Sequence, residues 1–209
     1  MRLPMRLVVM AALVLVAASC ADRRGTPKPK VDMKGLDRKL STFAFIEEGN
    51  LVTFIVDTRP TRYREEGGYI PIEICVANRG LKKISLTRES FTLRDQDGKE
   101  YPCAGPKELM DNYDFLDLDR RLAELGEIVF NRFGAFIQYP SKFSPTRDVP
   151  AYILDSTLVR DSVGLPQFGF IIDFIYFPRP ATGVVGKRFE LFMNAPELPD
   201  PVFVKFAVL

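Results

Sequence analysis

Apolar and polar residues alternate in several short segments after residue 40, which is the pattern of β-strands that bury one face. The clearest segment is Tyr69–Ala77, in which Ile70, Ile72, Ile74 and Val76 share one face. Similar segments, separated by turn-forming sequences, occupy residues 42–46, 51–57, 84–86, 90–94, 99–101, 188–193 and 202–209. Strands this short, with a turn signal about every ten residues, predict a mainly β protein with an antiparallel β-sandwich.

The segment Phe168–Phe177 departs from simple alternation because it carries apolar residues on both faces. A strand of this kind needs apolar cover on both sides of its sheet. The predicted outer cover is a short helical insertion at about residues 104–127, where leucines recur at helical spacing and Pro106 suits a first helical turn. Within the insertion a helix is predicted over 120–125, ended by Gly126. The apolar and aromatic residues 128–139 fit either a helix or a strand.

The N-terminus has the pattern of a secretory signal peptide. Arg2 and Arg6 precede Leu7–Ala18, an unbroken apolar run of twelve residues. A membrane-spanning helix needs about 20 apolar residues, so this run is too short for one. The following sequence, with small residues before Cys20, resembles a bacterial lipobox, and this resemblance implies cleavage before Cys20 and attachment of lipid to it.

These patterns divide the chain into three parts. Residues 1–19 are predicted to be the lipoprotein signal peptide, and residues 20–39 to be the lipidated cysteine with a flexible, basic tether. A coil of this length reaches about 25 Å. Residues 40–209 are predicted to form one β-sandwich domain.

Composition narrows the possible functions. Removal of residues 1–19 takes Arg2 and Arg6 from the 29 basic residues and leaves 27 basic against 27 acidic ones. A neutral chain lacks the basic face that nucleic-acid binding requires, so no nucleic-acid partner is expected. The chain contains no histidine, which removes the Ser-His-Asp and Cys-His catalytic arrangements. No enzymatic activity and no cofactor are predicted, and a hydrolase that uses carboxylates ranks last among the functions considered.

Cys75 and Cys103 form a possible disulfide if the domain lies in an oxidising compartment. A single cysteine in a strand is also often a small buried residue. The sequence leaves both interpretations open.

Asp95, Asp97 and Glu100 are weak candidates for a calcium site. An EF-hand loop has glycine at its sixth position, whereas Gly98 is the fourth residue counted from Asp95. A hairpin turn explains the same residues without a metal.

Other charged residues allow a functional or a structural interpretation. Arg59, Arg62 and Arg64 fit an anion site or a solvated loop, and solvated surface is favoured. The carboxylates of Asp111, Asp114, Asp117 and Asp119 fit a cation site, helix caps or solvated surface. Asp173 lies within an aromatic strand and therefore requires a partner or a solvent-facing edge; a structural role is favoured.

The segments Ile72–Gly80 and Ser90–Tyr101, together with Ile175–Pro178, resemble the immunoglobulin-like domains of small bacterial envelope lipoproteins. In such domains, a strand ending in Asn-x-Gly leads to a hairpin ending in Asp-Gly-Lys-x-Tyr, and a late aromatic strand ends in Phe-Pro. The resemblance covers about half of the mature chain. It implies an immunoglobulin-like antiparallel β-sandwich, and assigns no activity.

The expected function is that of a membrane-anchored, non-enzymatic module that binds an envelope protein or assists envelope assembly. The alternative is a carrier that holds a small apolar ligand or a lipid in a cavity of the sandwich. Ala21 follows the lipobox cysteine, whereas aspartate there retains Gram-negative lipoproteins in the inner membrane. The resemblance therefore implies the periplasmic face of the outer membrane in a Gram-negative host.

Overall fold

The computed structural model describes residues 44–64, 66–140, 143–145 and 162–208. The predicted signal peptide, the predicted lipidation site Cys20 and the predicted tether at residues 20–39 lie outside the described residues. The described residues belong to one compact unit. No helix in the described part of the chain is long and apolar enough to cross a membrane.

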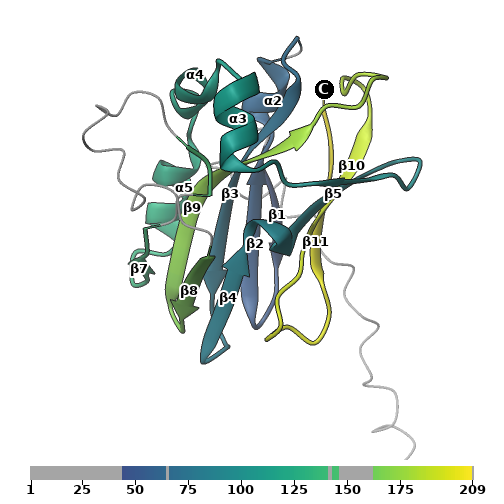
Figure 1. Cartoon of the computed structure of the whole chain (residues 1–209). Coiled ribbons are helices and arrows are strands. Elements are labelled where there is room, and N and C mark those ends of the chain that lie inside the picture. The colour runs from purple at the N-terminus through teal and green to yellow at the C-terminus, as the bar shows by residue number, and fades with distance from the viewer. Residues whose placement is uncertain (1–43, 65, 141–142, 146–161, 209) are drawn as a thin grey trace, which may run out of the picture. The chain divides into compact units, whose positions relative to one another are not determined.

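Five strands form the largest sheet: β1 (Ala44–Glu48), β2 (Val52–Asp57), β3 (Tyr69–Asn78), β7 (Ile137–Gln138) and β9 (Gly169–Pro178). Their order across the sheet is β1-β2-β3-β9-β7 (Figure 1). All neighbours run antiparallel except the short strand β7, which runs parallel to β9. The predicted hairpin of the first two strands is present, with its turn at Gly49-Asn50.

Four strands form a second sheet: β5 (Phe91–Asp95), β6 (Glu100–Pro102), β10 (Arg188–Met193) and β11 (Val202–Ala207). Their order is β11-β10-β5-β6, and all pairs are antiparallel. Two further strands, β4 (Lys83–Thr87) and β8 (Ser162–Pro166), pair with each other, and a 3₁₀ turn at Arg88–Ser90 links β4 to β5. The prediction of a mainly β protein with antiparallel sheets is confirmed.

The main hydrophobic core lies between the inner faces of these sheets. The predicted apolar face of β3, Ile70 to Val76, packs there with Leu93 of β5 and Leu191 of β10. Phe54 and Phe91 meet within this core, with ring centroids 6.1 Å apart. Burial of such side chains contributes about 1.5–3 kcal/mol each, so this cluster is the main source of stability.

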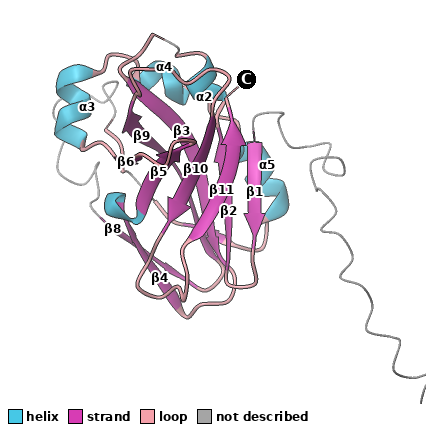
Figure 2. Cartoon of the chain, turned by 90° about the vertical axis from the view of Figure 1, so that its right-hand side faces the viewer, coloured by secondary structure: helices cyan, strands magenta, loops and turns pink. Residues whose placement is uncertain are grey.

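The helices cover the outer face of the five-stranded sheet. They are α2 (Arg59–Arg62), α3 (Pro106–Asn112), α4 (Leu116–Arg120) and α5 (Leu125–Arg132). Figures 1 and 2 show α2, α3 and α4 at the end of the sheet where β3 begins, and α5 further along its outer face. Two apolar clusters result. The cluster under α5 contains Leu125, Val129 and Phe170, and the cluster under α3 and α4 contains Leu109, Leu116 and Tyr176. The predicted cover on both faces of β9 is therefore present.

Two details of the helical region differ from the prediction. The helix predicted over 120–125 is absent: α4 ends at Arg120, and Gly126 lies in the first turn of α5 instead of ending a helix. A tertiary contact explains this difference. The buried Glu73 side chain accepts hydrogen bonds from the backbone N–H groups of Glu124 and Leu125, and these bonds fix the start of α5 at Leu125. Residues 128–139, which fit either structure, contain the end of α5 and the strand β7.

Candidate functional site

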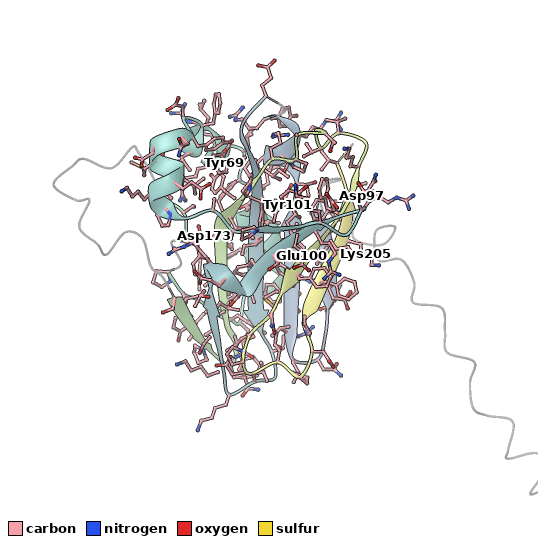
Figure 3. All side chains as sticks on the ribbon, turned by 45° about the vertical axis from the view of Figure 1, so that its right-hand side comes forward. Tyr69, Asp97, Glu100, Tyr101, Asp173 and Lys205 are labelled. Atoms are coloured by element: carbon pink, nitrogen blue, oxygen red, sulfur yellow. The ribbon has the colours of Figure 1, made fainter. Side chains whose placement is uncertain are left out.

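The predicted calcium residues form a hairpin turn between β5 and β6. The Asp95 carboxylate accepts hydrogen bonds from the backbone N–H groups of Asp97 (3.0 Å) and Lys99 (2.9 Å) and from the Tyr101 hydroxyl (2.9 Å). Glu100, which is labelled in Figure 3, instead pairs with Arg94 at 2.7 Å. Among the described residues no group of three or more acidic or cysteine side chains is placed to hold a metal ion. These residues therefore stabilise the turn.

Cys75 and Cys103 are free thiols in the structure. Cys75 is fully buried under α5, on the outer face of β3. Cys103 follows β6 and packs against the main core between the sheets. The two side chains thus belong to different hydrophobic clusters. Of the two interpretations that the sequence allows, this arrangement fits two separate cysteines better than a disulfide.

Asp173 has a structural role in the described residues. Its carboxylate accepts hydrogen bonds from the backbone N–H groups of Phe143 (2.6 Å) and Phe174 (2.8 Å). The contact with Phe143 holds that residue in the core, where its ring packs edge-on against Phe91. The buried charge therefore has the hydrogen-bond donors that it requires.

Arg64, which the sequence assigns to solvated surface, forms an ion pair with Asp119, for which the sequence leaves a cation site, a helix cap or solvated surface open. Asp119 of α4 is fully buried, and its Oδ1 lies 2.8 Å from Nε of Arg64. The Tyr113 hydroxyl donates a 2.7 Å hydrogen bond to Oδ2 of the same carboxylate. Burial raises the pKa of Asp119 to about 6, although the Tyr113 hydrogen bond and Arg64 oppose this rise. The expected loop therefore contains the helix α2, and the expectation of solvated surface is wrong for Arg64.

A buried pair of carboxyl groups lies on the outer face of the five-stranded sheet, and sequence analysis missed it. Asp57 and Glu73 are directly opposite each other on β2 and β3. Oε2 of Glu73 accepts hydrogen bonds from the N–H groups of Glu124 (3.0 Å) and Leu125 (3.2 Å). Burial raises the pKa of Glu73 to about 8, and the neighbouring Asp57 adds to the rise. The available signal was one acidic residue in each of two adjacent, otherwise apolar strands.

A hollow of about 460 Å³ opens beside this pair, in the gap between the two outer clusters. Ile172 and Phe174 contribute apolar surface to it, and Glu73, Arg120 and Glu127 contribute ionisable groups. Arg120 also donates to the carbonyl (3.1 Å) and hydroxyl (3.0 Å) oxygens of Ser144. The hollow lies outside the main core, and its lining is partly charged, so it differs from the apolar inter-sheet cavity that a lipid carrier would need.

An aromatic patch, defined here as Phe136, Ile137 and Phe168, lies where α5 leads into β7. The side chain of Ile137 is 64% exposed and that of Phe168 is 50% exposed. The rings of Phe136 and Phe168 pack edge-to-face with centroids 5.3 Å apart. The backbone N–H of Ile137 donates to the carbonyl of Phe168 (2.9 Å), so the two segments are joined directly.

Phe168 has an unusual backbone conformation. Its φ angle is +61°, and it is the only non-glycine residue with positive φ in the described part of the chain. Such a conformation costs a bulky L-residue about 1–2 kcal/mol, and glycine or asparagine usually occupies it. The N–H of Phe168 donates to the carbonyl of Asn78 (2.8 Å), which fixes the conformation. A strained position that displays a large apolar side chain to solvent is a recognised indicator of a functional surface.

Positive charge borders the patch. Arg79, which follows Asn78, and Arg132 at the end of α5 both pair with the single carboxylate of Glu48, at 2.6 Å and 2.8 Å. Lys82 and Lys83 are exposed in the segment after Arg79. Lys83 pairs in register with Pro166, two residues before Phe168. The border therefore carries more cationic than anionic side chains.

Comparison with protein-family models, with curated proteins and with solved structures finds no match to this chain.

Proposed function

We propose that the protein is a lipid-anchored envelope module with an immunoglobulin-like β-sandwich domain, and that it binds a protein partner through the aromatic patch. The exposed, strained Phe168 is the observation that carries this proposal. Apolar side chains that are displayed together on a surface are characteristic of protein-interaction sites, and aromatic residues are enriched among the residues that dominate binding energy.

The partner surface is expected to be apolar with acidic residues around it. Arg79 and Arg132 share one carboxylate, and Lys82 and Lys83 add further positive charge nearby. Complementary charge at the edge of an interface accelerates association and selects the orientation of the partner. The apolar centre of the interface would supply most of the affinity.

The structural context supports binding over ligand transport. Large apolar side chains from both sheets, such as Phe54 and Phe91, pack against each other in the main core. The hollow beside Glu73 has a partly charged lining and lies on the other face of the sheet. No feature of the described residues favours the alternative of an apolar-ligand carrier.

Site-specific photo-crosslinking in intact host cells tests the partner. A photoreactive residue replaces Ile137, and crosslinked products are identified by mass spectrometry. We expect one envelope protein with an acidic surface at its contact point. Phe168→Ala should reduce this product at least about fivefold, because removing an aromatic side chain at the centre of an interface commonly costs more than 1 kcal/mol. The matched control is Phe203→Ala, which removes an exposed phenylalanine from β11.

Several outcomes would refute this proposal. They are the absence of a protein product, a product that Phe168→Ala leaves unchanged, a product of two copies of this chain, and a product that contains only lipid.

Replacement of Cys20 by alanine tests the anchor. Without the cysteine there is no site for the lipid, whose acyl chains contribute about 0.8 kcal/mol per buried CH₂ to membrane attachment. We expect Cys20→Ala to move the protein from the membrane fraction to the soluble fraction, measured by fractionation and immunoblotting. Ser19→Ala, which keeps the cysteine, is the control. Full membrane retention of Cys20→Ala would contradict the lipid anchor.

A further inference from the structure

Asp57 and Glu73 form a carboxyl pair that is hidden from solvent. They are directly opposite in the antiparallel register of β2 and β3, and their exposed fractions are 0% and 2%. Side chains opposite each other on one face of a sheet have Cβ atoms about 5 Å apart. Two ionised carboxylates at such a distance in a buried site repel each other strongly.

The hydrogen bonds of the pair leave one acceptor without a donor. Oδ1 of Asp57 accepts a 2.8 Å hydrogen bond from the backbone N–H of Arg59. Oδ2 of Asp57 is buried and has no hydrogen-bond partner among the described residues. On Glu73, Oε2 is used by the N–H groups of Glu124 and Leu125 at the start of α5. A proton carried by the other oxygen of Glu73 would provide the donor that Asp57 lacks.

We propose that Asp57 and Glu73 share one proton, and that this protonated pair is a pH-dependent switch that holds the start of α5 against the sheet. Protonated Glu73 donates to Oδ2 of Asp57 and accepts from the N–H groups of α5. Loss of the proton leaves two buried negative charges, and movement of α5 that admits water relieves their repulsion.

The surrounding charges do not cancel this repulsion. Arg59 forms an ion pair with Glu124, so its charge is already shared with a third carboxylate. Titratable and charged groups next to Glu73 come from β2, α2, β3, α4 and α5: Asp57, Arg59, Cys75, Arg120, Glu124 and Glu127. Asp173, from β9, is occupied by the N–H groups of Phe143 and Phe174.

The pKa values agree with a shared proton and set the pH range. Burial raises the pKa of Glu73 to about 8, with Asp57 adding to the rise and the Leu125 hydrogen bond and Arg59 opposing it. Burial also raises the pKa of Asp57. Because the folded-state pKa of Glu73 exceeds its ordinary value of 4.5, the stabilisation is complete below that value and is lost as the pH rises through about 8.

Hydrogen–deuterium exchange of the full-length protein tests the switch, with peptides that contain the first turns of α5. We expect protection factors, which correct for the intrinsic exchange rate, to fall about tenfold or more between about pH 6.5 and about pH 9.5. Glu73→Gln reproduces the protonated side chain, because its carbonyl accepts from α5 and its amide donates to Asp57. Protection in this variant should stay constant over this pH range, because glutamine carries no proton that can be lost. Glu100→Gln, which removes an exposed carboxylate on β6 of the other sheet, should behave like the wild type.

A direct titration complements the exchange measurement. In ¹³C NMR of glutamate-labelled protein, the carboxyl signal that disappears in Glu73→Gln should titrate near pH 8. Asp57→Asn removes the opposing charge and should lower this midpoint by about one unit or more.

The proposal is overturned by a wild-type Glu73 midpoint near 4.5, by an unchanged midpoint in Asp57→Asn, or by protection of α5 that does not vary with pH. Both measurements are made without a partner, so their failure leaves the aromatic patch as a binding site untouched. An effect of the switch on partner binding rests on the proposed function, because α5 leads into the patch.

Discussion

At the scale of single residues, Phe168 combines a bulky side chain with a backbone conformation that favours glycine. Its φ of +61° suits glycine, and its ring is half exposed. In a position chosen for stability alone, a smaller residue without the steric conflict would serve better. The conflict is consistent with selection for the exposed ring, as the proposed binding function requires.

Two substitutions at this position measure the backbone strain. Phe168→Gly and Phe168→Ala remove the same ring contacts with Phe136, but only glycine adopts positive φ without cost. We expect the glycine variant to be more stable than the alanine variant by about 1 kcal/mol, opposite to the usual order of these residues in strands and helices. Urea unfolding followed by circular dichroism measures the difference, since the chain has no tryptophan. A more stable alanine variant would show that Phe168 does not adopt positive φ.

At the scale of elements, buried ionisable side chains fix where the helices lie on the sheet. The Arg64–Asp119 ion pair connects the loop before β3 to α4. Glu73 connects β3 to the start of α5. Arg179 adds a further connection, because its side chain donates to the backbone carbonyls of Arg64, Gly67 and Tyr69. Each helix is short, so tertiary contacts of this kind supply most of its stability.

Removal of the Arg64 side-chain charge should show the strength of this docking. Arg64→Met leaves the buried Asp119 carboxylate with the Tyr113 hydroxyl but without its cation. Breaking a buried ion pair on one side costs about 3 kcal/mol, and we expect this loss in urea unfolding at neutral pH. Asp119→Asn in the same background should restore much of the stability, because a neutral amide needs no counter-ion. Equal stability of Arg64→Met and the wild type would mean that the ion pair contributes little.

At the scale of the whole molecule, the arrangement of the two sheets places the two described cysteines in different hydrophobic clusters. Cys75 lies on the outer face of one sheet and Cys103 against the core between the sheets. Burial raises the pKa of both thiols, that of Cys103 to about 12. A thiol in this environment is largely uncharged at neutral pH and reacts slowly.

Thiol counting tests this arrangement. In Cys20→Ala protein that is denatured without reductant, we expect two free thiols, from Cys75 and Cys103. In the folded protein both should react slowly, with the half-buried Cys103 ahead of the fully buried Cys75. A count of zero after denaturation would establish the disulfide instead.

The local pattern of the sequence was sufficient for most strands. Alternation identified β3 and its inward face, and the Asp-Gly sequence identified the β5–β6 hairpin, because both depend on residues that are neighbours along the chain. The two apolar faces of residues 168–177 likewise required cover on both sides of β9.

The start of α5, the pairing of Arg64 with Asp119 and the pairing of Asp57 with Glu73 depended on the tertiary structure. Each of these contacts joins residues from different elements. A charged residue in a polar stretch of sequence is expected to be solvated, and it becomes buried only when another element packs over it. The exposure and strain of Phe168 were hidden for the same reason, since its conformation is fixed by hydrogen bonds to Asn78 and Ile137. The sequence alone determined the β-rich class, because the alternation of side chains depends only on neighbouring residues. The tertiary structure decided which polar and aromatic residues form sites, because such sites require contacts between segments that are distant in the sequence.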